Sequence, residues 1–231
     1  MSQTTTENVQ LTDGRELRLT VAEPDGVVRG GIVVLHEARG VTDTVHRLLG
    51  SFADEGWLAV APHIYRETIG SAEVAGAEVA ANVEALTGES VLADTDATCM
   101  WLGQRDVADD RVGVIGFDLG GAVALVVAAN RTVGAAVSVA APGILQPIST
   151  GLPALVDVAG ELSCPWLGIF ADRDARITAD EVDKLRESAE GSEAVSEVVR
   201  LAGADNRFDT DPDSAEQAWH RTVNWFDSHL R

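Results

Sequence analysis

The chain has 231 residues, of which 37 are acidic and 17 are basic, and its formal net charge is −20. Such a charge repels phosphate backbones, which argues against nucleic-acid binding, and no uncharged apolar stretch is long enough to span a membrane. The N-terminus is polar and lacks the basic start and apolar run of a secretory signal, so we expect a cytoplasmic protein.

Short apolar runs alternate with longer amphipathic stretches, and this alternation predicts parallel βαβ units. An alternating segment at 16–24 is typical of an antiparallel edge hairpin. Buried strands are then predicted at 31–36, 57–62, 111–117, 134–140, 164–170 and 196–202. Helices are predicted at 43–55, 90–104, 119–130, 179–190 and 213–229. The sequence therefore predicts a single α/β domain over residues 1–231, with helices on both faces of a mostly parallel sheet.

The last predicted helix carries apolar residues at helical spacing. They are Ala215, Trp219, Val223, Phe226 and Leu230. We expect its Trp and Phe to anchor the hydrophobic core rather than to contact a ligand.

The stretch GVIGFDLGGAVAL at 113–125 is typical of a strand, a sharp turn and a helix. Small residues stand two positions before Asp118 and two and three positions after it, as in the turns that carry hydrolase nucleophiles. Asp118 occupies the tip, where Ser or Cys is expected. The backbone N–H of Leu119, which opens the helix, is a candidate oxyanion donor. The other interpretation is an aspartate that caps the helix after an ordinary βα turn.

The context of this turn resembles the dienelactone hydrolase family. Residues 29–66 read RGGIVVLHEARGVTDTVHRLLGSFADEGWLAVAPHIYR, with the family's H-E-x-x-G, G-[WY]-x-x-x-x-P and P-x-x-Y-R patterns. RVGVIGFDLGG, CPWLGIFADRDARIT and VVRLAGADNRFDT follow in the family's order. The resemblance implies a single-domain α/β-hydrolase fold with about seven to eight strands, no large lid, no cofactor and a monomeric state.

The family's triad consists of a Cys or Ser nucleophile, an Asp and a His. By this resemblance Asp118 holds the nucleophile position and Asp174 the acid position, with Asp172 as the alternative acid. Asn206 holds the histidine position in GADNRF. The triad is therefore expected to be degenerate.

Further site residues follow from the same resemblance. Glu37 matches a glutamate beside the nucleophile, and the N–H of Ala38 matches the second oxyanion donor. Ionising several carboxylates in one cluster costs free energy. We therefore expect the negative charge of this cluster to be neutralised by Arg39, Arg66 or Arg207, or by a bound cation, although the spacing matches no metal motif. The same arginines are candidates to bind a carboxylate-bearing ligand.

The chemistry of these replacements decides the functional expectation. An ionised Asp118 can attack an alkyl carbon, but Asn206 offers no basic site to activate water afterwards. Among the five histidines, His63 is the best substitute base because it follows a predicted strand, and the competing interpretation is a loop histidine hydrogen-bonded to backbone. The remaining histidines are expected to lie away from the site: His36, His46, His220 and His229.

Two functions remain open from the sequence. The first is a dienelactone-hydrolase-like protein without standard esterase activity, a pseudoenzyme that binds a small molecule. The alternative is a hydrolase that acts on an ester, lactone or alkyl substrate through Asp118, as nucleophile or general base, together with Asp174 and Glu37. Both assume a small-molecule ligand, and neither assumes a metal, a nucleic acid or a membrane.

Overall fold

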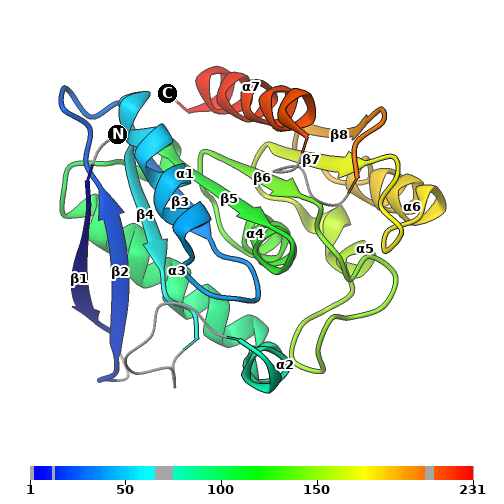
Figure 1. The fold of residues 1–231 in the computed structure, drawn as a ribbon, viewed down its shortest axis with the longest axis horizontal. Helices are drawn as coiled ribbons and strands as arrows, with labels where there is room; N and C mark the ends of the chain where they lie inside the picture. Colours follow the sequence, from blue (N-terminus) through cyan, green and yellow to red (C-terminus); the bar gives the residue numbers. More distant parts are fainter. Residues whose placement is uncertain (1–2, 12–13, 66–74, 206–210, 231) are drawn as a thin grey trace.

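The computed structural model describes residues 3–11, 14–65, 75–205 and 211–230. Within these residues, eight strands form a single sheet in the order β1-β2-β4-β3-β5-β6-β7-β8 (Figure 1). The strands are β1 (Thr4–Gln10), β2 (Glu16–Ala22), β3 (Gly31–Leu35), β4 (Leu58–Pro62), β5 (Val112–Phe117), β6 (Ala135–Val139), β7 (Trp166–Ala171) and β8 (Ser196–Leu201). β2 is antiparallel to both of its neighbours, and all other pairs are parallel. The predicted mostly parallel sheet is confirmed.

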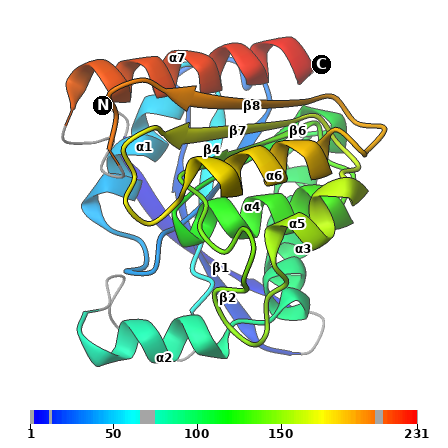
Figure 2. The same cartoon turned by 90° about the vertical axis from the view of Figure 1, so that its right-hand side faces the viewer.

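Helices cover both faces of this sheet. One face packs against α1 (Asp43–Asp54) and α7 (Pro212–His229), and the other against α3 (Gly88–Gly103), α4 (Leu119–Asn130) and α6 (Ala179–Ala189). Figure 2 shows the arrangement at one edge, where α7 lies on one side of β7 and β8 and α6 lies on the other. The shorter elements are α2 (Ala77–Ala85), α5 (Leu155–Val158), η1 (Asp109–Arg111) and η2 (Ala159–Glu161). No helix of the described part of the chain is long and apolar enough to cross a membrane.

Local sequence explains the central elements. Every residue of β3 (GIVVL) is buried, as expected for a β-branched strand covered on both faces. α4 follows β5 after a single residue and is buried over its first ten residues, from Leu119 to Ala128. α6 begins with a capping box in which Thr178 and Glu181 exchange side-chain and backbone hydrogen bonds. The central strands and α4 therefore form a well-packed support for the one-residue turn between β5 and α4.

The edge strand β1 was not predicted, because its sequence TTTENVQ is polar and carries no hydrophobic alternation. It pairs in antiparallel register along the whole of β2. Glu7 connects it to α3 and the turn that follows, accepting hydrogen bonds from Trp101 Nε1 at 2.9 Å and Arg105 Nη2 at 2.8 Å. Charged residues on an exposed edge also discourage pairing with another sheet. α2, which buries none of its residues, was not predicted either.

The expected apolar face of α7 is partly wrong. Its buried residues are Ser214, Ala218, Thr222, Trp225 and Phe226. Phe226 is fully buried as predicted, but Trp219 is only partly buried. Trp219 still packs against the core, with its ring 4.9 Å from that of Phe52.

Candidate active site

Asp118 stands at a strained turn between β5 and α4. Its backbone adopts φ 52° and ψ −120°, which a non-glycine residue rarely adopts. The turn is held by close backbone contacts, since a Cβ on Gly116 would lie 1.9 Å from the carbonyl oxygen of Gly120. A Cβ on Gly120 would lie 2.1 Å from the carbonyl oxygen of Leu35. The small residues that the sequence pattern places here are therefore required by the backbone geometry.

An arginine that the sequence analysis did not single out joins the two candidate carboxylates. Arg176 Nη1 donates to Asp118 Oδ2 at 2.9 Å. Arg176 also donates to Asp174, from its backbone N–H at 2.8 Å and from Nε and Nη2 at 3.2 Å each. The side chain of Asp174 is only 1% exposed, whereas those of Arg176 and Asp118 are 43% and 39% exposed. Arg176 therefore bridges a buried acid and an accessible carboxylate.

The bridge also determines what Arg176 can do chemically. Hydrogen bonding to Asp174 raises the pKa of Arg176, and the bond to Asp118 raises it further against the opposing effect of burial. A guanidinium is a donor only, so Arg176 orients Asp118 but accepts no proton. We expected neutralisation from Arg39, Arg66 or Arg207. Arg176 is an arginine bonded to Asp118 in the structure, and the expectation for the other three arginines stays a prediction. Arg66, Arg207 and Asn206 lie outside the described residues.

Asp172, the alternative acid, has a different partner. Its Oδ1 accepts a hydrogen bond of 2.7 Å from the backbone N–H of Gly203, so it connects the end of β7 to the turn after β8. Asp174 is thus the carboxylate that the structure brings to Asp118, through Arg176.

His36 is held entirely by backbone. Its Nε2 accepts from the N–H of Ile64 at 3.2 Å, and its Nδ1 lies 2.8 Å from the carbonyl oxygen of Glu37. With Nε2 accepting, Nδ1 must carry the proton and donate it to that carbonyl. Burial lowers the pKa of His36 to about 4. It is therefore a neutral connector between two loops. The expectation that His36 lies away from the site is wrong, because it lines the pocket that contains Glu37 and Asp118.

His63 lies away from Asp118. Its Nε2 is 2.9 Å from Thr20 Oγ1, its backbone N–H donates to Arg18, and its side chain does not line the pocket that contains Asp118. Burial lowers the pKa of His63 to about 3, with smaller contributions from His36, Arg18 and His46. This is the environment of a loop histidine bonded to its neighbours.

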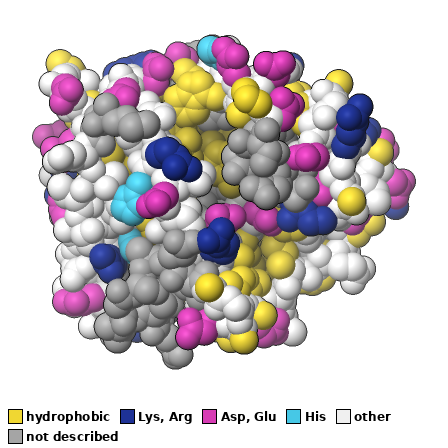
Figure 3. Space-filling model, viewed as in Figure 1, with side chains coloured by type: hydrophobic (Ala, Val, Ile, Leu, Met, Phe, Trp, Pro, Cys, Tyr) yellow, Lys and Arg dark blue, Asp and Glu magenta, His cyan; other side chains and the backbone are white. Residues whose placement is uncertain are grey.

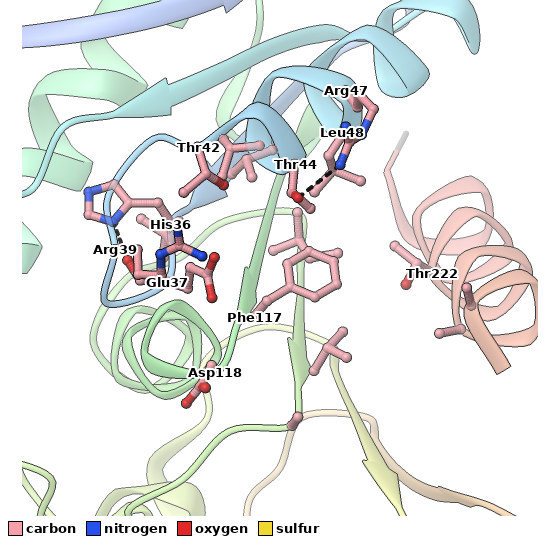
Figure 4. A pocket seen from close by; sticks show the side chains of 18 of the residues that line it. His36, Glu37, Arg39, Thr42, Thr44, Arg47, Leu48, Phe117, Asp118 and Thr222 are labelled. Atoms are coloured by element: carbon pink, nitrogen blue, oxygen red, sulfur yellow. Dashed lines mark hydrogen bonds between the residues drawn. The ribbon is translucent and has the colours of Figure 1, made fainter. Parts of the chain in front are cut away.

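A pocket of about 770 Å³ opens beside Asp118, between the first turns of α1 and the N-terminal half of α7. Glu37 and Arg39 line it together with Asp118, so the structure brings these three predicted residues to one cavity (Figure 4). Seen from outside, the hollow has hydrophobic side chains on its wall and charged side chains around it (Figure 3). Trp219, predicted as a core anchor, is part of the lining.

Two candidate oxyanion donors are next in sequence to residues that line this cavity. Leu119 is the first residue of α4, and Ala38 lies in the loop after β3. β3 and β5 are neighbouring parallel strands that pair Leu35 with Gly116, so both loops leave the sheet at the same edge. The helix N-terminus adds a partial positive charge there.

Tyr65, which the sequence analysis quoted only as part of a motif, packs against the pocket-lining His36. Burial raises its pKa, and the carboxylates of Glu37 and Asp118 raise it further, which places the phenol within electrostatic reach of both. Its hydroxyl has no hydrogen-bond partner among the described residues, and its ring meets that of His36 edge-on at 5.0 Å. The P-x-x-Y-R pattern was the signal that could have identified it.

Across the four described ranges, no group of three or more His, Cys, Asp or Glu side chains is arranged to hold an ion. Asp118 and Asp174 are instead linked through the Arg176 guanidinium.

Comparison with known proteins identifies the family. Residues 17–230 match the model of the dienelactone hydrolase family. The chain belongs to this family. This dienelactone-hydrolase-like hydrolase is 29% identical over 215 residues to a carboxymethylenebutenolidase of Rhodococcus opacus, covering 86% of the chain and 81% of the relative. A Yersinia pestis protein assigned the same activity is 26% identical over 229 residues, covering 94% and 86%.

The solved structures agree with this membership. A Klebsiella pneumoniae protein assigned as a dienelactone hydrolase is 26% identical and superposes with a TM-score of 0.86, covering 97% of this chain and 98% of that one. A dienelactone hydrolase-like phosphotriesterase from metagenomic libraries, 20% identical with a TM-score of 0.81, shares the fold and covers 99% and 100%. The family member described here thus has the α/β-hydrolase fold over its whole described length.

Proposed function

We propose that this protein hydrolyses a carboxylic ester or lactone, with Asp118 as general base and Arg176 in place of the usual imidazole. The substrate class follows from the relatives, which carry the name carboxymethylenebutenolidase, an activity on a butenolide lactone. The route differs because the nucleophile position holds a carboxylate in this sequence. We infer that the standard triad chemistry is replaced rather than conserved.

One observation carries the proposal. Asp118 keeps the strained turn conformation at the edge of a pocket, and its carboxylate is bonded to Arg176, which is itself bonded to buried Asp174. Strain of this kind costs on the order of 1–3 kcal/mol and persists where the surrounding structure maintains it. An unbridged Asp118 would face Asp174 as a like charge. The guanidinium of Arg176 therefore supports the proposal that Asp118 is an ionised carboxylate that can act as a base.

The hydrolytic step can be written with these groups. Oδ2 of Asp118 is occupied by Arg176, which leaves Oδ1 to accept a proton from water as the water oxygen attacks the acyl carbon. The N–H groups of Leu119 and Ala38 would stabilise the oxyanion. Collapse breaks the bond to the alkoxy oxygen, which takes the proton back from Asp118. An ester gives one carboxylic acid and one alcohol, a lactone gives one hydroxy acid, and Asp118 returns to its ionised form.

A second function, ligand binding without turnover, is favoured by a specific observation. His36 is the one imidazole among the described residues that line the pocket, and both of its ring nitrogens are engaged by backbone. A carboxylate is a weaker base than imidazole near neutral pH, so any turnover should be slow.

Purified protein assayed against aryl esters and small lactones separates the two functions. We expect slow hydrolysis that Asp118→Asn abolishes and that Asp180→Asn, in an exposed pair with Lys184, leaves unchanged. Hydrolysis that survives Asp118→Asn, or its complete absence in the wild-type protein, would reject the proposal. If the wild-type protein hydrolyses nothing, calorimetric titration with lactone and carboxylate ligands tests ligand binding without turnover.

Intact mass after incubation with an alkyl epoxide tests the remaining route through Asp118. If Asp118 acts as a nucleophile on alkyl carbon, its oxygen bonds to carbon, the ring C–O bond breaks, and the opened alkoxide takes a proton. The protein then gains the whole mass of the epoxide. We expect no adduct, because the proposed step uses Asp118 as a base.

A further inference from the structure

β8 forms one edge of the sheet, and its outer hydrogen-bonding side is open. Among the described residues it pairs with β7 alone, and in Figure 2 it lies between α7 and α6 with no other described element in front of it. The carbonyl oxygens of Val195 and Leu201 accept hydrogen bonds from the β7 side. Backbone groups of successive residues in a strand alternate between its two sides, so the N–H and C=O groups of Ser196, Val198 and Arg200 point away from β7. These groups are available to a further strand.

The side chains of this edge are partly apolar. Val195 is 60% exposed, and Val198 and Val199 are only partly buried although helices cover both faces of the sheet. Glu197 forms an ion pair with Arg221 of α7 at 3.6 Å, so its charge is balanced within the chain. The opposite edge strand, β1, has the polar sequence TTTENVQ. β8 is therefore the edge at which pairing with another chain would also cover apolar surface.

Opposite charges flank the two ends of β8. Arg200, near its end, is exposed and has no ion pair with a described residue. Before its start, Glu187, Glu190 and Glu193 are exposed in the last turn of α6 and in the turn that follows. The C-terminus of α6 adds the negative end of the helix dipole. An antiparallel second strand would bring the basic end of one β8 to the acidic end of the other.

Two-fold symmetry selects the register of such a pair. Directly opposed residues of an antiparallel pair point to the same face, and the residues with open backbone groups must bond to one another. With the axis at Val198, this residue opposes its own copy, and Ser196 opposes Arg200 of the other copy. An axis at Val199 would instead set the charged Arg200 against the apolar Val198. The register centred on Val198 is therefore the better matched one.

We propose that the protein forms a dimer in which β8 pairs in antiparallel orientation with β8 of a second copy about a two-fold axis at Val198. The two sheets then join into one. Val195 of each copy packs against Leu201 of the other, and Arg200 of each copy lies beside the acidic turn of the other. This dimer differs from the monomer that the family resemblance implies. It uses no residue of the pocket beside Asp118, so it is independent of the proposed function.

Cysteine cross-linking tests the position of the axis. The Cα atoms of a hydrogen-bonded antiparallel pair lie about 5.5 Å apart, which a disulfide can span. Val198→Cys should therefore give a covalent dimer on a non-reducing gel after mild oxidation with diamide.

Two control variants should give no more covalent dimer than the wild-type protein, which has the free cysteines Cys99 and Cys164. In Val199→Cys the two new thiols belong to diagonal neighbours, whose Cα atoms lie about 7–8 Å apart and beyond the reach of a disulfide. Val27→Cys is at a position 90% exposed in the loop before β3, and it reports random collisions. Cross-linking of either control at the level of Val198→Cys would overturn the proposed pairing.

Sedimentation velocity measures the association in solution. Each copy has a net charge of −20, so the experiment uses about 0.15 M salt, where exposed charges more than about 8 Å apart are largely screened. We expect the wild-type protein to dimerise at concentrations up to about 100 μM. Val198→Pro removes an N–H that points away from β7, so this variant should fold and stay monomeric. Arg200→Glu should weaken the dimer at least about tenfold.

Charge-matched variants complete the test. Arg18→Glu changes the net charge equally at an exposed position of β2, and it should leave the dissociation constant within about twofold. Adding Glu190→Arg and Glu193→Arg to Arg200→Glu should restore association. A wild-type protein that stays monomeric would overturn the proposal, as would a dimer that none of the β8 variants weakens. In either case, hydrolysis that depends on Asp118 would leave the proposed function standing.

Discussion

Arg176 meets Asp174 through three hydrogen bonds, one from its backbone N–H and two from its guanidinium. Both carboxylate oxygens of Asp174 accept at least one of them. The carboxylate at the position that the sequence assigns to the triad acid is therefore already hydrogen-bonded to a guanidinium. An imidazole would have to compete with Arg176 for the same oxygens. The remaining nitrogen, Nη1, extends this pairing to Asp118.

The first prediction concerns stability. Arg176→Ala leaves Asp174, with a side chain 1% exposed, without its guanidinium partner. We expect the free energy of unfolding to fall by about 1–3 kcal/mol, since a buried charged acceptor loses its two guanidinium donors and keeps only the backbone N–H. Urea unfolding measures it. The exposed pair of Arg186 and Asp183 is the control, and Arg186→Ala should cost less than about 1 kcal/mol. Equal losses in the two variants would mean that the bridge has no special role.

The second prediction concerns recovery of standard esterase chemistry. By the sequence resemblance, Asp118→Cys with Asn206→His supplies a nucleophile and a base. We expect this pair to raise arylesterase activity, and we expect Arg176→Ala added to it to raise kcat further, because the new imidazole then reaches Asp174. Initial rates with 4-nitrophenyl acetate check this. A triple variant no faster than the double variant would show that Arg176 does not compete for the acid.

The third prediction concerns pH. His36 has a folded-state pKa of about 4 and His63 of about 3, both below the ordinary value of 6.5, because burial disfavours the charged ring. Below about pH 6.5 the unfolded chain binds protons that the folded chain does not, so the free energy of unfolding falls as pH falls. For His36 this loss levels off below about pH 4. The slope is at most about 1.4 kcal/mol per pH unit for each histidine.

Urea unfolding between pH 7 and pH 5 tests this, since most carboxylates stay ionised there. His63→Gln should flatten the slope, and His220→Gln, at an exposed position, should leave it unchanged. Identical slopes in the wild-type protein and His63→Gln would contradict the assignment for His63.

The fourth prediction concerns the turn around Asp118. Gly116→Ala places a Cβ 1.9 Å from the carbonyl oxygen of Gly120, so we expect little folded protein. Gly103→Ala, at the end of α3 with nothing within 4 Å of its new Cβ, should be neutral or stabilising by up to about 1 kcal/mol. Soluble yield and thermal unfolding of the two variants compare them. A well-folded Gly116→Ala protein would mean that the turn relaxes more easily than its contacts indicate.

Sequence reasoning recovered the parts of the fold that follow from hydrophobic pattern. β3, β5 and α4 begin or end within a residue or two of their predicted bounds, because buried β-branched runs and the glycine-rich turn are strong local signals. β1 was missed because pairing with β2, not its own hydrophobicity, makes it a strand.

The candidate site was recovered only where a motif marks it. Asp118, Glu37 and Arg39 reach one pocket as expected. Arg176 could not be found from pattern, because its role arises from the folding of the loop after β7 back onto α4. Only the structure shows which carboxylates Arg176 reaches.

His36 acts as a strut between two parts of the chain that are distant in sequence. It links the carbonyl of Glu37 to the N–H of Ile64, so the arm that carries Ala38 and the segment that leads to Tyr65 are mechanically joined. We therefore expect a displacement of either segment to be transmitted to the other through His36. A ligand that displaces the segment at Tyr65 should therefore also change the orientation of the Ala38 amide. Engineering of this hydrolase has to change the two segments together.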